Sequence, residues 1–423
     1  MIKKSTFSIA DSKHFKEQML EWCKRFNICS LFDSQQYEQQ YQSFESMLAV
    51  GSVDSIALNL IDYSSLKQFI HKEKRWLIGH VSFGFHSIVD SPVKEDKIGF
   101  PLLHLYEPEI IVQLHAQEVI IYSHKETPYS IFDAINATQI VASITAASVT
   151  FSPTITKEQY LATIQQLQEH IHRGDCYEIN FCQEFYAADT LIDSYAVYKR
   201  LCNISPTPFS SFYRFNDAYL ICASPERFLK KQGDKIIAQP IKGTSARNKE
   251  DALLDNLNKE ELLLDKKERA ENVMIVDLMR NDLSKFCKEG TVKVEELFGI
   301  YSFPQVHQMI STIIGEVGSE FDFTDILQAT FPMGSMTGAP KKRVLELINE
   351  YEISERGLYS GSVGYITPEG DFDFNVVIRS ILYNAAKRSV SYQVGSGITF
   401  YSDAEKEYEE CLIKAIGMQK ALS

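Results

Sequence analysis

The order in which helix-type and strand-type segments follow one another after Pro153 most limits the folds open to this chain. Helices are indicated by apolar residues three or four positions apart, and strands by short runs rich in Val, Ile, Tyr and Phe. The predicted order is a helix over 156–174, strands over 177–185, 209–222 and 235–241, a long helical stretch over 249–282, helices over 323–330 and 341–350, strands over 361–383 and 391–400, and a helix from 402 to about 420. Because strands and helices do not alternate regularly, the pattern favours an α+β fold over a Rossmann fold.

Local signals mark where several of these segments start and turn. Thr156 and Gln159 have the spacing of a capping box, and Ser402 and Glu405 have it again before the last helix. Asn216 fits a hairpin turn in the middle of the second strand run. We therefore expect two helices to begin at these boxes and a β-hairpin to fill that run.

Composition excludes several classes of function. The 423 residues carry a formal net charge of −13 and no run of lysine and arginine, which argues against nucleic-acid binding. No apolar stretch reaches the length needed to cross a bilayer, and the N-terminus lacks the apolar core of a signal peptide. The eight cysteines are scattered and form no C-x-x-C. We expect free thiols in the cytoplasm, with neither a membrane nor a nucleic acid as partner.

The character of the sequence changes near residue 150. Residues 1–150 carry few dense polar motifs, whereas residues 151–423 hold the candidate site motifs. We expect 1–150 to form the N-terminal part of the fold and 151–423 to form its catalytic region.

Two pairs of glutamates stand at helical spacing. Glu407 and Glu410, with Lys414 one turn further, fall on one face of the last helix, and Glu268 and Glu271 fall on one face of the central helical stretch. If the two faces met, their carboxylates would form a hard oxygen site suited to Mg²⁺, which keeps waters and takes further ligands from substrate. The alternative is two solvated helix faces, because glutamate pairs at this spacing are common. The sequence alone does not place the two helices opposite each other.

Lys242 ends an apolar strand and is followed by Gly243. A lysine at a strand end that opens toward a pocket is partly desolvated, loses its proton more readily and can act as a nucleophile. The alternative is an ordinary strand-end lysine in solvent.

Three further features suit acid catalysis or anion binding. Glu226 directly follows a proline after the predicted hairpin and could be a general acid, although Pro-Glu is also common in turns. The small-residue loop 334–341 leads into a helix, so its N–H groups and the helix dipole suit a carboxylate or phosphate. Gly395 and Gly397 mark a second place where backbone could approach a ligand closely.

His307 and Arg379 stand near strand-type segments, where either could serve a site or simply satisfy the structure. The chain contains no G-x-C-x-G or G-x-S-x-G sequence, so it shows no glutaminase or esterase nucleophile.

Together and in this order, these motifs resemble component I of the chorismate-utilising enzymes, a family that includes anthranilate, aminodeoxychorismate, isochorismate and salicylate synthases. The matching blocks are GDCYEIN (174–180), SPERF (224–228), PIKGT (240–244), RAENVMIVDLMRNDL (269–283), FPQVHQM (303–309), FPMGSMTGAPKKR (331–343), GSVGY (361–365), VVIRS (376–380), VGSGI (394–398) and EYEECLIK (407–414). The resemblance implies a single large α+β domain like that of anthranilate synthase component I, with two β-sheets packed together and flanked by helices.

The resemblance also implies a role for each candidate residue. Glu226 would protonate the departing C4 hydroxyl of chorismate, and His307 would lie near the ring. The residues implied to hold Mg²⁺ on the ring carboxylate are Glu271 and Glu410, with Glu268 and Glu407 nearby. Those implied to contact the two carboxylates are Thr337, Gly338, Tyr365, Arg379, Gly395, Gly397 and Lys414, with Arg379 on the enolpyruvyl group.

Lys242 separates the members of the family. Anthranilate and isochorismate synthases typically carry Ala there, whereas in the aminodeoxychorismate branch this lysine attacks C2 as the C4 hydroxyl leaves. Ammonia then adds at C4 and expels the lysine. Members that add water carry a lysine at the position of Glu178, so water addition is disfavoured here.

The activity implied is therefore conversion of chorismate and ammonia to 4-amino-4-deoxychorismate for p-aminobenzoate and folate synthesis. A glutamine amidotransferase subunit would supply the ammonia. The close alternative is anthranilate synthase component I, and a non-catalytic chorismate-binding subunit is the alternative from another class.

Overall fold

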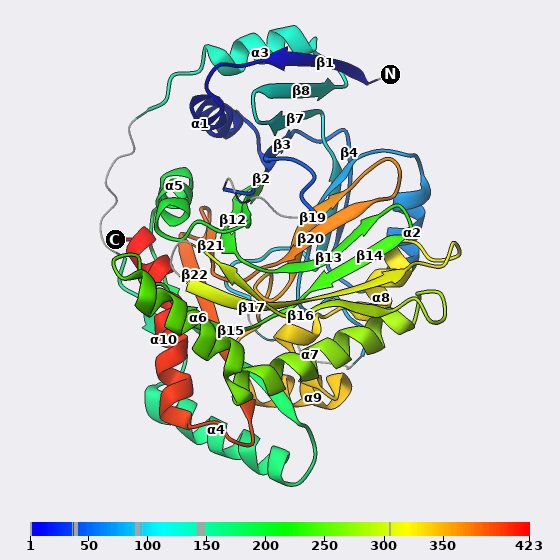
Figure 1. Cartoon of the computed structure of the whole chain (residues 1–423). Helices are drawn as coiled ribbons and strands as arrows, with labels where there is room; N and C mark the ends of the chain where they lie inside the picture. Colours follow the sequence, from blue (N-terminus) through cyan, green and yellow to red (C-terminus); the bar gives the residue numbers. More distant parts are fainter. Residues whose placement is uncertain are drawn as a thin grey trace.

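The computed structural model describes residues 2–35, 37, 41–88, 94, 96–141, 149–303 and 306–423. Within them, the strands form two large antiparallel sheets that lie face to face, with helices around them (Figure 1). In order across it, the first sheet contains β1 (Lys3–Ser8), β8 (Glu118–Ser123), β7 (Ile110–His115), β3 (Ser46–Val50), β2 (Ile28–Asp33), β11 (Phe209–Phe215), β12 (Ala218–Ser224), β21 (Ser380–Asn384), β22 (Ser389–Thr399), β10 (Glu178–Ala187) and β18 (Gly338–Ala339), with β9 (Ser152–Pro153) on β10.

The second sheet and the helices complete the fold. In order, this sheet contains β15 (Ile241–Ala246), β17 (Val306–Glu316), β14 (Lys235–Gln239), β13 (Arg227–Gln232), β20 (Phe372–Val376), β19 (Ser362–Ile366), β5 (Leu77–Val81), β6 (Leu103–Glu107) and β4 (Asp54–Leu58), with β16 (Lys293–Ser302) on β17. The helices are α1 (Ser12–Trp22), α2 (Tyr63–His71), α3 (Pro128–Asn136), α4 (Lys157–His172), α5 (Ser194–Ile204), α6 (Ala252–Leu264), α7 (Lys266–Ser284), α8 (Phe323–Thr330), α9 (Lys341–Tyr351) and α10 (Ala404–Ala421), with 3₁₀ turns η1 (Cys23–Arg25) and η2 (Gly334–Met336).

Both faces of the first sheet are buried, because successive side chains of a strand point to opposite faces. In β3, Leu48 and Val50 belong to an apolar cluster shared with α1, α3, α4, α5, α9 and α10. Met47 and Ala49 belong to a second cluster, which lies between the two sheets and includes residues of α7 and α8. The first sheet is therefore the middle layer of the molecule.

The first 150 residues and the rest of the chain share both sheets. In the first sheet β2 pairs with β11, and in the second β5 pairs with β19. The expectation of one α+β domain with two packed sheets and flanking helices is confirmed. The change of character near residue 150 marks no break in either sheet.

The predicted start of one helix and the predicted turn of one hairpin are confirmed. Thr156 and Gln159 form the predicted capping box of α4. Asn216 has a φ of 54°, which suits the tight turn between β11 and β12. The expected hairpin is therefore present.

Two predictions about helices are wrong. The stretch 249–282 forms two helices rather than one, because Asp265 has extended backbone and its side chain accepts a hydrogen bond from the N–H of Glu268. The last helix is capped by Asp403 rather than Ser402, whose hydroxyl instead accepts from the N–H of Thr399. In both places an aspartate forms the cap, and aspartate is among the most favoured N-cap residues.

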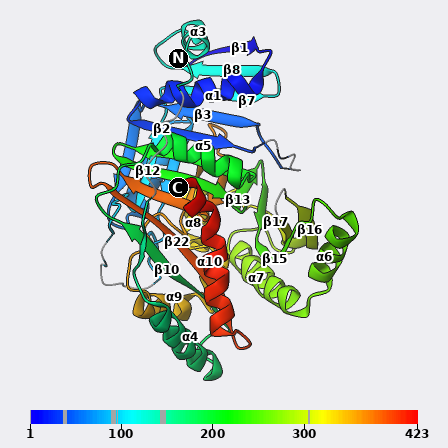
Figure 2. The ribbon, with the colours of Figure 1, turned by 90° about the vertical axis from the view of Figure 1, so that its left-hand side faces the viewer.

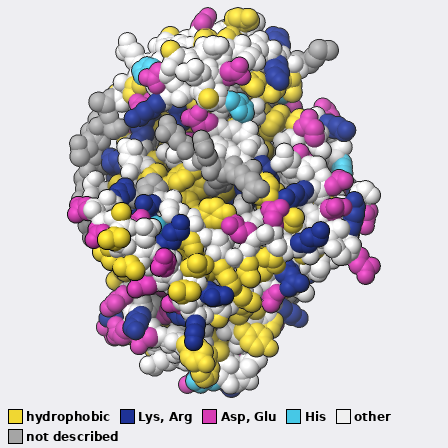
Figure 3. All heavy atoms as spheres, viewed as in Figure 1, with side chains coloured by type: hydrophobic (Ala, Val, Ile, Leu, Met, Phe, Trp, Pro, Cys, Tyr) yellow, Lys and Arg dark blue, Asp and Glu magenta, His cyan; other side chains and the backbone are white. Residues whose placement is uncertain are grey.

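Among the described residues, no helix combines the length and apolar character of a membrane span. On the face shown in Figure 3, lysine and arginine lie among acidic side chains rather than in one continuous patch.

Candidate functional site

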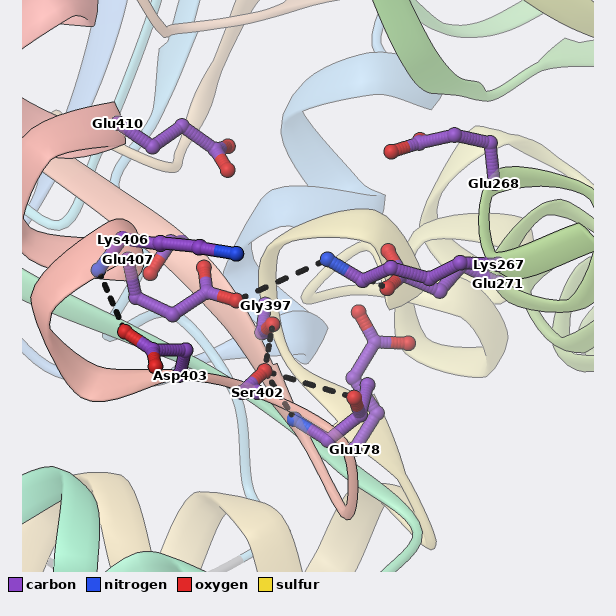
Figure 4. A network of polar contacts seen from close by, with 12 residues as sticks. Glu178, Lys267, Glu268, Glu271, Gly397, Ser402, Asp403, Lys406, Glu407 and Glu410 are labelled. Carbon is purple, nitrogen blue, oxygen red and sulfur yellow. Dashed lines mark hydrogen bonds and ion pairs between the residues drawn. The ribbon is translucent and has the colours of Figure 1, made fainter. Parts of the chain in front are cut away.

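Helices α7 and α10 present glutamates to the same space from opposite sides (Figure 4). Lys267 lies between the helices, with its Nζ 3.7 Å from Glu271 and 3.8 Å from Glu407. Glu268 and Glu410 point toward each other from the two sides in the same view. The two predicted glutamate pairs therefore come together, although more than 130 residues separate them in the chain.

The glutamates are not simply solvated helix faces. Glu407 is buried, and only 13% of the side chain of Glu271 is exposed. Burial raises the pKa of Glu271 to about 7, although Lys242 and Lys267 act to lower it. Burial likewise raises the pKa of Glu268. The neighbouring lysines therefore do not fully offset the effect of burial on Glu268 and Glu271, and a bound cation would stabilise their ionised forms.

Glu410 behaves differently from the other glutamates. Burial acts to raise its pKa, but Lys414 outweighs that effect, so the pKa of Glu410 is lowered. The Nζ of Lys414 lies 2.6 Å from Glu410 and donates to the carbonyl of Gly395 at 2.9 Å. Lys414 thus ties α10 to β22.

The donor set fits Mg²⁺ as a partial site. Within the part of the chain that the structure describes, no three acidic, His or Cys side chains converge as a preformed metal cage. One oxygen of Glu271, Oε1, is buried and has no hydrogen-bond partner. Mg²⁺ commonly takes one or two protein carboxylates and completes its octahedron with water and substrate oxygens. The paired helices could offer that number of carboxylates.

Lys242 joins the edge of the second sheet to the first. Its Nζ lies 2.5 Å from Oε1 of Glu178 on β10 and 3.9 Å from Glu271 on α7. Burial acts to lower the pKa of Lys242, but Glu178 and Glu271 hold it above its ordinary value. The prediction of a readily lost proton is therefore wrong for this arrangement, in which the amine is an ammonium held by carboxylates.

The two predicted glycines of β22 leave room for these side chains. The antiparallel register places Gly397 opposite Asn180 and Gly395 opposite Cys182. A Cβ at Gly397 would lie 2.6 Å from Oε1 of Glu178 and 2.8 Å from Nζ of Lys242. A side chain at Gly397 would therefore displace the ion pair.

The small-residue loop lies along the edge of β10. Gly338 has a φ of +138°, and a Cβ there would lie 2.1 Å from the backbone oxygen of Glu178. Thr337 is fully buried, and its hydroxyl hydrogen-bonds to the carbonyl of Met333 at 3.1 Å. The loop is therefore packed against the strand that carries the partner of Lys242.

Glu226 lies in the turn between β12 and β13 and is 5% exposed. Burial raises the pKa of Glu226 to about 7, while a hydrogen bond from Ser335 and the charge of Lys242 act to lower it. This carboxyl group can therefore hold a proton near neutral pH, as a general acid must.

Arg379 is a half-buried cation without a counter-ion among the described residues. Its guanidinium makes no hydrogen bond and no ion pair with any residue that the structure describes. Burial lowers the pKa of Arg379, while Tyr359 and Glu410 act to raise it. A desolvated charge is costly unless it is paired, so this position favours an anionic ligand.

The structure does not bring Tyr365 to this cluster. The alternation of β19 directs Tyr365 into a separate cavity, which Phe32, Arg227 and Asp373 also line. The tyrosine beside Arg379 is Tyr359, whose hydroxyl lies 3.8 Å from Sγ of Cys182. Sequence reasoning missed Tyr359, although it stands two residues before the GSVGY block.

Both ring nitrogens of His307 bond to side chains outside the glutamate cluster. Its Nδ1 lies 2.9 Å from the hydroxyl of Ser302, and its Nε2 lies 3.1 Å from Asp255 on α6. Both ring nitrogens are thus bonded within the part of the molecule formed by α6 and β15–β17, seen beside α7 in Figure 2. Residues 304 and 305 of the same FPQVHQM block lie outside the described residues.

Comparisons with known proteins cover nearly the whole chain. The family model described as chorismate binding enzyme matches residues 26–420. Aminodeoxychorismate synthase component 1 of Bacillus subtilis is 30% identical over 395 residues, which cover 92% of this chain and 76% of that protein. The protein of the same name from Escherichia coli is 39% identical over 268 residues, 63% of this chain and 58% of that protein. Anthranilate synthase component I from Streptococcus pneumoniae is similar in structure, with a TM-score of 0.77 at 25% identity over 91% of this chain and 95% of that one.

Proposed function

The chain belongs to the family of chorismate-binding enzymes, and from this premise we propose that it converts chorismate and ammonia to 4-amino-4-deoxychorismate. The product would feed p-aminobenzoate and folate synthesis. The observation that carries this proposal is the amine of Lys242, buried at the junction of the two sheets beside two carboxylates.

Chorismate is a dicarboxylate, and the site offers positive charge and backbone donors to it. Arg379 has no counter-ion among the described residues and suits the enolpyruvyl carboxylate. In the loop, the N–H of Thr337 donates to the carbonyl of Gly334 at 3.1 Å, which leaves the N–H of Gly338 to suit a second anionic group. Glu271 and Glu410, with Glu268 and Glu407 nearby, would hold Mg²⁺, which supplies positive charge against the ring carboxylate in an acidic chain.

The chemistry requires Lys242 to be neutral when it attacks. Glu178 lies 2.5 Å from its Nζ and is therefore positioned to take the proton. The Nζ–C2 bond forms, the two ring double bonds shift from C1=C2 and C5=C6 to C1=C6 and C4=C5, and the C4–O bond breaks. Glu226 gives its proton to the departing hydroxyl, which leaves as water. Ammonia then bonds to C4, both double bonds shift back, and the bond from C2 to Lys242 breaks, which releases the amine.

Ammonia would come from a partner. The relatives in Bacillus subtilis and Escherichia coli are named as component 1 of their synthases. We expect a glutamine amidotransferase subunit to serve as the second component and to release ammonia from glutamine beside this chain.

Identification of the product tests the proposal. The purified chain would be incubated with chorismate, Mg²⁺ and ammonium, and the product would be separated and identified by mass spectrometry. Retention of the enolpyruvyl group with an amino group in place of the hydroxyl is expected. No turnover even at high ammonium would instead indicate a non-catalytic chorismate-binding subunit.

The second candidate is anthranilate synthase component I, which the similarity to the Streptococcus pneumoniae structure favours. That enzyme adds ammonia at C2 and eliminates pyruvate. Fluorescent anthranilate with one equivalent of pyruvate in the same assay would establish this candidate and reject the first.

A further inference from the structure

Between the short strands β18 and β9, the edge of β10 is completed by two side chains. β18 pairs only with Glu178 and Ile179, and the N–H of Asn180 donates to the carbonyl of Thr337. Beyond that point, the N–H of Cys182 donates to Oε1 of Glu352 at 2.9 Å, and the carbonyl of Asn180 accepts from Nη2 of Arg356 at 2.8 Å. A carboxylate and a guanidinium thus take the place of the next residues of a neighbouring strand.

All five donors of Arg356 are used, and the side chain is 1% exposed. Two bonds go to the carboxylate of Glu352, at 2.6 and 2.8 Å. The others go to the carbonyl of Met336 at 2.7 Å, the hydroxyl of Ser360 at 3.3 Å, and Asn180. The guanidinium also lies 4.4 Å from the ring centre of Phe83. Its orientation is therefore fixed from every side.

The two backbone carbonyls that Arg356 binds belong to different parts of the site. Met336 stands two residues before Gly338, the loop position assigned above to an anionic group of the substrate. Asn180 stands two residues after Glu178, which holds Lys242. Together with the β10–β18 pairing, this side chain sets the spacing between the anion-binding loop and β10, whose Glu178 contacts Lys242.

We propose that Arg356, oriented by Glu352, is a positioning residue that holds the loop 334–338 in register with β10, so that a bound dicarboxylate meets Lys242 at the correct distance. This inference rests on the proposed function. Arg356 touches no substrate in this account and acts only through the backbone of its two neighbours. Lysine cannot replace it, because a single ammonium does not reach both carbonyls and the carboxylate in one plane.

The test compares Arg356→Lys with Arg227→Lys. Arg227 is also a buried arginine paired with a carboxylate, Asp373, but it lines the separate cavity and contacts neither the loop nor β10. Initial rates would be measured as a function of chorismate and of ammonium concentration. Each rate would be divided by the concentration of folded protein. Arg356→Lys should raise the KM for chorismate by about tenfold or more and leave the KM for ammonium within twofold, because a misplaced substrate contact weakens binding of that substrate. Arg227→Lys should leave both within twofold.

A purely structural role gives a different pattern. If Arg356→Lys and Arg227→Lys lower the amount of folded protein alike and leave both KM values unchanged, the inference is overturned. If Arg356→Lys does not fold, Glu352→Gln replaces it, since glutamine keeps the shape and one acceptor. It should raise the KM for chorismate by a smaller factor, and an unchanged value overturns the inference.

This test separates failure of the inference from failure of the proposed function. The KM for chorismate can be measured whichever product forms, whereas the product itself decides the function. A variant that shows the KM effect while the chain makes anthranilate would keep Arg356 in its positioning role.

Discussion

The protonation state of Lys242 depends on carboxylates from two other elements. Glu178 on β10 and Glu271 on α7 together outweigh the effect of burial, so the pKa of the amine is raised. A nucleophilic lysine in this setting needs a partner that accepts its proton as well as a substrate to attack. Glu178 is the nearest acceptor, at 2.5 Å.

Removal of the amine should abolish the proposed reaction. Lys242→Ala alone would leave Glu178 buried without its partner, which costs about 3–5 kcal/mol of folding stability. We therefore pair Lys242→Ala with Glu178→Gln and compare turnover with that of the wild type, while Glu178→Gln alone shows how much of the loss comes from removal of the proton acceptor. The double variant should lose aminodeoxychorismate formation by at least about a thousandfold, because it lacks the nucleophile. Its chorismate affinity, measured by calorimetry, should match that of Glu178→Gln alone. Turnover of the double variant at the wild-type level would refute attack by lysine.

The rate should fall as pH rises through the pKa of Glu226. Burial raises that pKa to about 7, and a general acid acts only in its protonated form, so the rate at saturating Mg²⁺ should decline as the pH rises above about 7. Ser335 acts to lower the pKa of Glu226, so Ser335→Ala should move this limb to higher pH. Glu226→Gln should lose the limb together with most of the rate. A pH profile that is identical in wild type and Ser335→Ala would assign the limb to another group.

At the scale of elements, the site depends on two helices that face each other. Lys267 bridges them through Glu271 and Glu407, and Lys414 ties α10 to β22. The break at Asp265 starts α7 afresh and places Lys267 and Glu268 in its first turn. A single continuous helix over 249–282 would have no N-terminus beside the site.

Loss of one carboxylate from α7 should weaken the binding of Mg²⁺. Glu271→Gln keeps the size of the side chain and removes its charge, so the Mg²⁺ concentration for half-maximal activity should rise by about tenfold or more. Asp277→Asn is the matched control, because Asp277 lies on the exposed side of the same helix and pairs with Arg280. Stabilisation of the protein by Mg²⁺ with chorismate, measured as a shift in Tm, gives a second readout. Equal Mg²⁺ curves in both variants would place the metal elsewhere.

At the scale of the whole molecule, strands distant in sequence form both sheets. β2 lies against β11, and β5 lies between β19 and β6. The apolar cluster between the sheets draws residues from both parts of the chain, including Met47 and Phe374. Each sheet therefore needs strands from both sides of residue 150.

A chain of residues 151–423 should therefore not fold on its own. It would lack the strands that cover β11 and β19, and their exposed edges and apolar faces would favour aggregation. Circular dichroism and thermal unfolding should show one cooperative transition for residues 1–423 and none for 151–423. A cooperative transition in the shorter chain would show that the catalytic region is an independent domain.

The sequence by itself determined the local structure and the chemical types present. Helical spacing, the capping box at Thr156 and the turn at Asn216 depend on neighbours within a few residues, and they are confirmed. The glutamate pairs at 268/271 and 407/410 could likewise be recognised from a period of 3.6. The helix start at Asp265 was missed, because its extended backbone interrupts an otherwise continuous apolar and polar pattern.

Only the tertiary structure decided which of these groups meet. The charge of Lys242 is fixed by carboxylates from β10 and α7, and the choice of Tyr359 over Tyr365 follows from which face of the fold each side chain reaches. The same holds for His307, whose two nitrogens are taken by α6 and β16. Spacing along a chain sets the face of one element, whereas contact between elements depends on packing of the apolar faces of both sheets, and no single segment contains that information.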